Sequence, residues 1–295
     1  MARNKCLIVL SEKSSGSSAF QELLSSLVTI RHVDTTRHGE NETLFWTKAA
    51  SILGMPQRRM VDSEVPIAPD QARRDLRALL VNNVPDARIP INDNDLIFDG
   101  WKALCSRYSP LFLEKSPHHL CQWSALQLIL RCMEKLDSTD FLLIGLIRNP
   151  MDTIYSQYKR WRSRPEAVEK QWRVAYTNLI ELKSRLNDQL VIIRYEDITL
   201  SLETLQPVLD FCGVPQHMLD KEFFHRHSIQ KWRNDNRFGF ALAAETVELA
   251  QSFGYSLSDL SNKTNLLWPY FRETSRALYK FRNSTRSVAR ALTLR

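Results

Sequence analysis

The 295-residue sequence contains little of what marks several protein classes. Its eight glycines and twelve prolines are too few for a collagen-like chain or a long low-complexity linker. Its five cysteines are odd in number and form no CxxC pair, so we expect free buried thiols rather than disulfides or zinc ligands. The longest apolar run, Phe141–Ile147, is far below the ~20 residues that span a bilayer, so we expect no transmembrane helix.

The first residues also lack the pattern of a secretory leader. The apolar run Cys6–Leu10 is too short for the core of a signal peptide, and no small-residue cleavage site follows it. The sequence therefore predicts a cytoplasmic protein. With 43% hydrophobic and 25% charged residues, it is typical of a globular chain of one large α/β domain or two small ones.

Acidic residues are scarce near the end of the chain. Residues 262–295 hold eight basic side chains and only one acidic side chain, Glu273, which accounts for the whole formal net charge of +7. The basic pI therefore describes this tail, and we expect no nucleic-acid partner. We predict a domain over residues 1–261 and a basic helical tail over residues 262–295. The tail is expected to dock on the domain with its basic face in solvent, and weak contact with a membrane surface is the alternative.

Strands and helices alternate along the predicted domain. This order favours an α/β protein with a parallel sheet covered on both faces, in which ligands bind beyond the carboxyl ends of the strands. Phe141–Ile147 is the most apolar strand and is expected at the centre, and Asp70–Val81 is expected to be an exposed, charged helix. The other strands are expected over Lys5–Leu10, Val28–Val33, Leu111–Glu114 and Leu190–Arg194, and the other helices over Ser17–Leu27, Glu42–Leu53, Leu120–Leu136, Pro150–Trp161, Val168–Leu186 and Leu202–Phe211.

A loop rich in serine follows the first strand. In Ser11–Ser18, a glycine and several serines precede a helix, whose first N–H groups and dipole can hold a phosphate, and Lys13 adds a positive charge. A serine-rich helix cap is the alternative. Because Ser17 rather than a lysine follows Gly16, the loop is not a Walker A sequence, which disfavours an ATPase or nucleotide kinase.

A second loop follows the strand Phe141–Ile147. Asn149 suits a helix cap and Pro150 the first helical position, which explains a helix start there. Capping does not explain Arg148 beside that helix N-terminus, or Ser156 about two turns further on the same face. Together they favour an anion site, because arginine binds phosphate with two parallel hydrogen bonds.

The two loops resemble the two signature regions of the PAPS-dependent sulfotransferase superfamily, whose members use 3′-phosphoadenosine 5′-phosphosulfate (PAPS) without a metal. Residues 148–158 match the pattern R-x-P-x-D-x-x-x-S-x-Y at all five fixed positions, and in the first loop Ser14 takes the usual basic position. The resemblance implies a three-layer α/β fold of the P-loop type, with a central parallel sheet flanked by helices. It assigns the 5′-phosphosulfate to residues 13–18, with Lys13 at the leaving oxygen, and the 3′-phosphate to Arg148 and Ser156.

Further resemblances follow in the family's order. Leu113–Pro117 is similar to a strand end that places Lys115 toward the sulfate or the acceptor, and Arg194–Asp197 is similar to the family's strand ending in Y-E-D. Ser228–Arg233 resembles the loop that closes over the 3′-phosphate and adenine. The implied PAPS-binding residues are Ser14, Ser15, Gly16, Ser17, Ser18, Arg148, Ser156, Tyr195, Ser228, Lys231, Trp232 and Arg233.

The sequence does not decide which residue is the general base. Glu42, in a stretch similar to one that carries a catalytic glutamate in heparan-type relatives, is the first candidate, and Glu40 is the second. A histidine is the third, as in the cytosolic branch, with candidates His38, His118 and His119. The resemblance implies sulfuryl transfer from PAPS to a hydroxyl or amine of a small molecule or carbohydrate, with Lys13, Lys115 and one of these bases as catalytic residues. A P-loop kinase-like phosphotransferase and a catalytically silent PAPS-binding protein are the alternatives.

Overall fold

The structure is a computed structural model that describes residues 3–85, 88–219, 224, 228–263 and 267–293. The chain folds into two compact units. Unit 1 comprises Met1–Arg148 and Gln171–Arg226, and unit 2 comprises Asn149–Lys170 and His227–Arg295. The predicted division into residues 1–261 and 262–295 stays a prediction.

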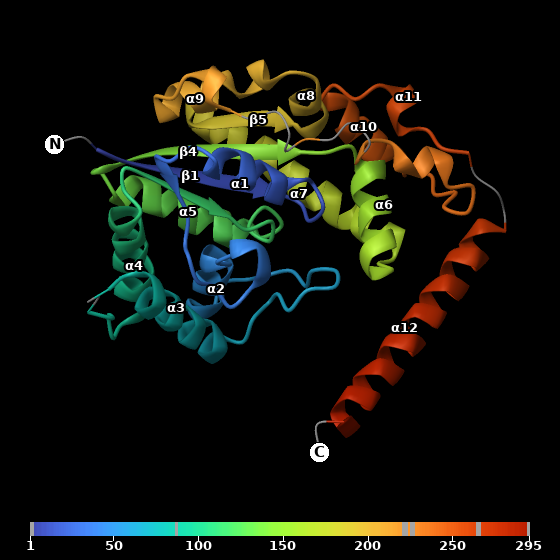
Figure 1. Ribbon diagram of the computed structural model, residues 1–295, viewed down its shortest axis with the longest axis horizontal. Coiled ribbons are helices and arrows are strands. Elements are labelled where there is room, and N and C mark those ends of the chain that lie inside the picture. Colours follow the sequence, from blue (N-terminus) through green and yellow to red (C-terminus); the bar gives the residue numbers. More distant parts are fainter. Residues whose placement is uncertain (1–2, 86–87, 220–223, 225–227, 264–266, 294–295) are drawn as a thin grey trace. The chain divides into compact units, whose positions relative to one another are not determined.

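Unit 1 contains a parallel sheet of five strands in the order β2-β3-β1-β4-β5 (Figure 1). The alternation of strands and helices predicted this α/β architecture. The strands are β1 (Asn4–Ser11), β2 (Ile30–Arg31), β3 (Leu111–Lys115), β4 (Thr139–Ile147) and β5 (Leu190–Arg194). The expected central position of Phe141–Ile147 is wrong, since β1 occupies the middle and β4 lies beside it. Both strands are buried, so apolar character alone does not rank them.

Helices surround this sheet (Figure 1). Those within unit 1 are α1 (Ser17–Ser25), α2 (Phe45–Ile52), α3 (Pro69–Asn83), α4 (Asp93–Arg107), α5 (Trp123–Lys135), α8 (Tyr195–Leu200) and α9 (Gln206–Cys212). The long helix α7 (Pro165–Leu186) begins in unit 2 and continues in unit 1. Short 3₁₀ turns lie at Gly39–Asn41, Asn187–Gln189, Leu202–Leu205 and Gln216–Met218.

Two helices differ from expectation. The expected exposure of Asp70–Val81 is wrong, because α3 buries one face that includes Leu76 and Leu80. Helix α4 was not among the predicted elements. It carries Trp101 into a cluster of aromatic rings with Phe45 and Trp46, at centroid separations of 4.8 and 4.7 Å. Trp101 also packs on Phe112 of β3 at a centroid separation of 5.3 Å, so the cluster joins α2 and α4 to the sheet.

Unit 2 is helical. Its elements are α6 (Pro150–Trp161), the first turn of α7, a 3₁₀ turn at Lys231–Asn234, α10 (Ala244–Ser252), α11 (Leu257–Leu260) and α12 (Trp268–Thr293). Asn149 caps α6 by accepting a hydrogen bond from the Met151 N–H at 2.9 Å, as its sequence predicted. Over the described residues, no helix is both long and apolar enough to cross a bilayer.

The basic tail forms helix α12, as expected, but one of its basic side chains is buried rather than in solvent. Arg272 is buried and donates to the Phe238 carbonyl at 2.8 Å, while Trp268 lies against Gly239. Phe271 and Leu278, by contrast, are 57% and 64% exposed. The expectation of a wholly solvated basic face is therefore wrong at Arg272.

Candidate active site

The loop between β1 and α1 is closed tightly by Tyr195 at the start of α8. Gly16 has φ +86°, a conformation that disfavours other residues, and a Cβ there would lie 2.3 Å from the Tyr195 ring. The position therefore requires glycine twice, for its backbone and for its lack of a side chain. A glycine N-cap provides no side-chain cap for α1. The first N–H groups of that helix, which have no intrahelical partner, can therefore face an anion.

Arg148 lies against the same loop within unit 1. Its Nη1 donates to the Ser14 carbonyl at 3.1 Å, and its guanidinium lies 4.7 Å from the centroid of the Tyr195 ring. Ser15 lies deeper, with its hydroxyl 3.1 Å from that of Tyr176. The ends of β1, β4 and β5 thus bring together Ser14, Arg148 and Tyr195, three residues that the sequence had placed in one donor site.

A buried cation–carboxylate pair lies at the end of the neighbouring strand β3. The Lys115 side chain has no exposed surface, and its Nζ lies 3.2 Å from Glu42 Oε1. The same ammonium donates to the Glu40 carbonyl at 3.1 Å and to the Ser18 hydroxyl at 3.4 Å. Ser18 belongs to the first turn of α1, so this pair is fixed beside the glycine–serine loop.

The environment of Glu42 suits proton transfer. Burial raises the pKa of its carboxyl above the ordinary range, although the charge and hydrogen bond of Lys115 oppose that rise. Glu40 is more exposed and accepts a hydrogen bond from the Ser18 hydroxyl. Of the two glutamates, Glu42 therefore combines a raised pKa with burial and a fixed partner.

The three histidine candidates have other environments. Burial, with nearby Lys13, lowers the pKa of His118 to about 3, which makes it a poor base at neutral pH. Its Nδ1 lies 3.7 Å from Glu42 Oε2, so it lines the carboxylate. His38 has Nδ1 3.1 Å from Glu64 and a pKa that burial lowers.

His119 belongs to a buried polar network under the site. Its ring nitrogens lie 2.9 Å from the Thr47 hydroxyl and 3.4 Å from Glu114. Burial alone would raise the pKa of Glu114, but His119, Ser116 and Thr43 outweigh it and hold that pKa below the ordinary value. The Ser116 and Thr43 hydroxyls also accept hydrogen bonds, each at 3.0 Å, from the N–H groups of Leu44 and Phe45, respectively. The network therefore supports the backbone around Lys115 and Glu42.

Lys13 is turned toward a segment that the sequence did not connect with it. Its Nζ donates to the carbonyls of Val61 and Asp62 at 2.5 and 3.0 Å, and burial lowers its pKa. The neighbouring Glu12 is buried and accepts hydrogen bonds from Gln171 at 2.6 Å and from the Cys121 thiol at 2.9 Å. Glu12 was not among the predicted site residues, although its position directly after a buried strand could have indicated it.

The remaining predicted residues belong to unit 2. There Gln230 N donates to Asp152 at 2.7 Å, which joins the segment that carries Ser228 to the start of the helix that carries Ser156. Trp232 is buried, whereas Lys231 and Arg233 are exposed. Over the described residues, no group of three or more His, Cys, Asp or Glu side chains could hold a metal ion.

Comparisons with known proteins agree with this geometry. The model of the family described as "Sulfotransferase family" matches residues 7–218. No curated protein matches the sequence. The crystal structure of a sulfotransferase from Alicyclobacillus acidocaldarius is similar at a TM-score of 0.50 and 16% identity, covering 88% of this chain and 98% of that one. At this identity the likeness supports the expected P-loop-type α/β fold.

Proposed function

The chain belongs to the sulfotransferase family, and from this premise we propose that it transfers a sulfuryl group from PAPS to a hydroxyl or amine of a small molecule or carbohydrate. The observation that carries the proposal is the buried pair of Lys115 and Glu42 beside Ser18 in the glycine–serine loop. It places a fixed cation and a base of raised pKa at the carboxyl edge of a parallel sheet, where such folds bind ligands.

The loop residues suit the donor. In PAPS, one oxygen atom bridges the activated sulfuryl group and the 5′-phosphate. When the sulfuryl group is transferred, the bond between sulfur and this oxygen breaks, and the oxygen leaves with negative charge. The uncapped start of α1 presents N–H groups to the phosphosulfate, with the hydroxyls of Ser14, Ser15, Ser17 and Ser18 around it. Arg148, held by Ser14 and Tyr195, supplies a planar cation for the 3′-phosphate. In unit 2, Ser156, Ser228, Lys231, Trp232 and Arg233 are assigned to the 3′-phosphate and adenine.

Each catalytic residue has one role. Glu42 accepts the proton of the attacking hydroxyl or amine, because its raised pKa favours proton capture. Lys115 stabilises the negative charge that spreads over the sulfuryl oxygens, and its contact with Glu42 fixes the distance between base and cation. Lys13 stabilises the leaving oxygen, for which it must exchange its contacts with Val61 and Asp62. Glu40 positions Ser18 through a hydrogen bond.

The donor assignment is tested by calorimetric titration of 3′-phosphoadenosine 5′-phosphate into the wild-type protein and Arg148→Ala. We expect micromolar binding that the substitution weakens at least about tenfold, the equivalent of 1.4 kcal/mol. Arg74→Ala, which removes an exposed arginine of α3, is the matched control and should bind like wild type. Absence of binding to the wild type would overturn the proposal, and binding of ATP with magnesium instead would favour the kinase-like alternative.

Turnover separates an enzyme from a silent binding protein. Release of 3′-phosphoadenosine 5′-phosphate from PAPS, with water as a slow acceptor, needs no knowledge of the natural acceptor. Binding without any such release, in the presence of varied hydroxyl and amine acceptors, would favour the silent alternative.

A further inference from the structure

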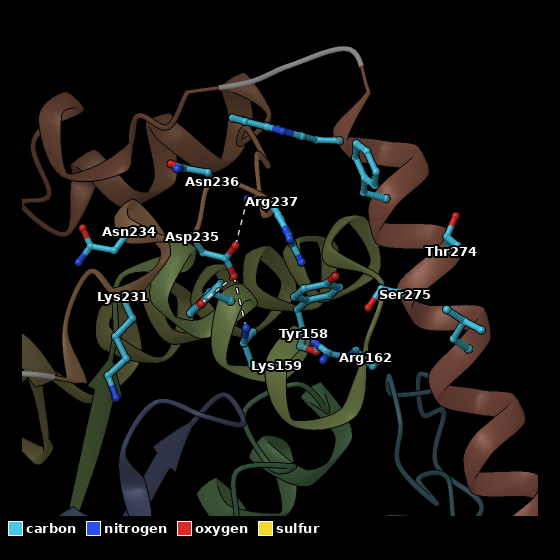
Figure 2. Close-up of a pocket in the computed structure, with 14 residues that line it drawn as sticks. Tyr158, Lys159, Arg162, Lys231, Asn234, Asp235, Asn236, Arg237, Thr274 and Ser275 are labelled. Carbon is cyan, nitrogen blue, oxygen red and sulfur yellow. Dashed lines mark hydrogen bonds and ion pairs between the residues drawn. The ribbon is translucent and has the colours of Figure 1, made fainter.

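Unit 2 contains a cavity that shares one residue, Lys231, with those proposed to hold the donor. Its volume is about 1100 Å³, and it lies between α6, the segment of residues 231–237 and α12 (Figure 2). The lining combines aromatic rings, amides, hydroxyls and cations. Its polar members include Lys159, Arg162, Lys231, Asn234, Asn236 and Arg237.

Positive charge in this cavity exceeds negative charge. Among the described residues that line the cavity, Asp235 is the one that is acidic, and it already accepts hydrogen bonds from the Tyr155 hydroxyl at 3.0 Å and from Lys159 at 3.3 Å. Arg162 and Arg237 form no ion pair with any carboxylate in the part of the chain that the structure describes. The Arg162 guanidinium lies 5.1 Å from the centroid of the Tyr158 ring, and both residues are labelled in Figure 2. An anionic group would therefore be attracted to this cavity.

One side of the cavity continues into an exposed apolar surface. Phe271 and Leu278 line the cavity, and with Tyr270 and Phe281 they form the apolar face of α12. At about 3.6 residues per turn, these four positions fall within about 100° of the helix circumference, which places them on one side of the helix. Tyr270 and Phe281 are 73% and 71% exposed, respectively. Such a face beside uncompensated cations has the chemistry of a helix that lies on an anionic lipid surface.

We infer that this apolar face of α12 docks on an anionic membrane, with the cavity of unit 2 holding a phosphate-bearing lipid head group. The charge of the tail argues against a second copy of the chain as occupant, since residues 262–295 carry eight basic side chains and one acidic one. Two such helices would repel each other. The inference goes beyond sulfuryl transfer, and the residues that test it, Arg162, Arg237 and Phe281, are not among those proposed to hold the donor.

The test is sedimentation of the full chain with vesicles at about 0.1 M salt. Vesicles of phosphatidylcholine with one-third phosphatidylglycerol should bind the protein at least about tenfold more tightly than vesicles of phosphatidylcholine alone, because each cation near an anionic surface adds to the affinity. The double variant Arg162→Gln/Arg237→Gln and the variant Phe281→Glu should each weaken binding about tenfold.

Matched controls lie in unit 1. Arg74→Gln removes the same type of charge from α3, and Val81→Glu replaces an exposed apolar side chain of that helix, so both should bind vesicles like wild type. Equal affinity for neutral and anionic vesicles, no vesicle binding, or full binding by the cavity variants would overturn the inference. Stabilisation by soluble glycerol phosphate without vesicle binding would assign the cavity to a free anion and also overturn it. Titration of 3′-phosphoadenosine 5′-phosphate into the same variants reports separately on the donor site.

Discussion

The two cation-rich regions of the molecule hold their charges in opposite ways. At the sheet edge of unit 1, Lys115 is completely buried and contacts Glu42, a backbone carbonyl and a hydroxyl. In the cavity of unit 2, Arg162 and Arg237 lie with one acidic residue among the described lining residues, Asp235, which already has other partners. The positive charge of Lys115 is therefore compensated by a carboxylate, whereas the positive charges of Arg162 and Arg237 are available to an anion.

This difference indicates that the two regions have different roles, catalysis in unit 1 and attraction of anions in the cavity of unit 2. A buried cation with a carboxylate partner keeps a fixed position, which transition-state stabilisation requires. Such a cation also changes the pKa of that carboxylate. An exposed cation is screened by salt over about 10 Å and cannot position a reacting atom, but it gathers anions. The comparison predicts that substitutions in unit 1 alter the rate and pH dependence, whereas substitutions in the cavity alter association.

The largest expected effect comes from breaking the unit 1 pair at Glu42. Glu42→Gln keeps the shape of the side chain but cannot accept a proton, and we expect turnover of PAPS to fall about 10³-fold. Glu42 acts only when ionised, so wild-type activity should fall as pH decreases through its raised pKa, a limb at higher pH than an ordinary glutamate would give. That limb should vanish in Glu42→Gln.

The matched control is Glu40→Gln, which removes the more exposed carboxylate nearby. Because Glu40 positions Ser18 and does not accept the proton, its loss should reduce turnover less than about tenfold. The acidic limb should remain but move to lower pH, since the charge of Glu40 raises the pKa of Glu42. A greater loss in Glu40→Gln than in Glu42→Gln would exchange their roles.

A second substitution converts the compensated pair into an isolated carboxylate. Lys115→Met removes the charge that opposes the effect of burial on Glu42, so turnover should fall about 10²-fold and the pKa of Glu42 should rise further. The acidic limb of the pH–rate profile therefore moves to higher pH, which loss of structure alone would not cause. Lys102→Met, at an exposed position of α4, should match wild type. An unmoved limb would show that Lys115 does not tune Glu42.

Local sequence was sufficient to predict most of the sheet. The strand at Leu190–Arg194 and the helix at Pro150–Trp161 were predicted with their observed bounds, because apolar runs and the Asn-Pro cap act within a few residues. Helix α4 was missed although its sequence carries a helical pattern, since Ile97, Trp101 and Leu104 recur at helical spacing and Asn92 caps its start. What one sequence does not show is the partner of its buried face, such as the packing of Trp101 on Phe45.

The candidate site followed the same rule. Position after a strand favoured Lys13 and Arg148 as site residues, because parallel strands end at one edge, whereas Lys115 was implied only by the resemblance of Leu113–Pro117 to a family strand end. Their partners could not be predicted, since the contact of Lys13 with Asp62 joins residues about fifty positions apart. The sequence also left the identity of the general base open. The burial of Glu42 and the low pKa of His118, which favour Glu42 over His118, are visible only in the structure.

The smallest expected effect tests how rigidly unit 1 holds its loop. Gly16→Ala places a side chain at φ +86° and 2.3 Å from the Tyr195 ring, whereas Gly54→Ala meets a similar φ of +64° with nothing within 4 Å. Urea unfolding should show a loss of about 1 kcal/mol for Gly54→Ala from backbone strain alone, and about 3 kcal/mol for Gly16→Ala. In a Tyr195→Ala background the cost of Gly16→Ala should fall to that of Gly54→Ala, because only the backbone strain remains. Equal losses in the wild-type background would mean that Tyr195 yields freely, and that the loop lacks the fixed geometry that distinguishes unit 1 from the cavity.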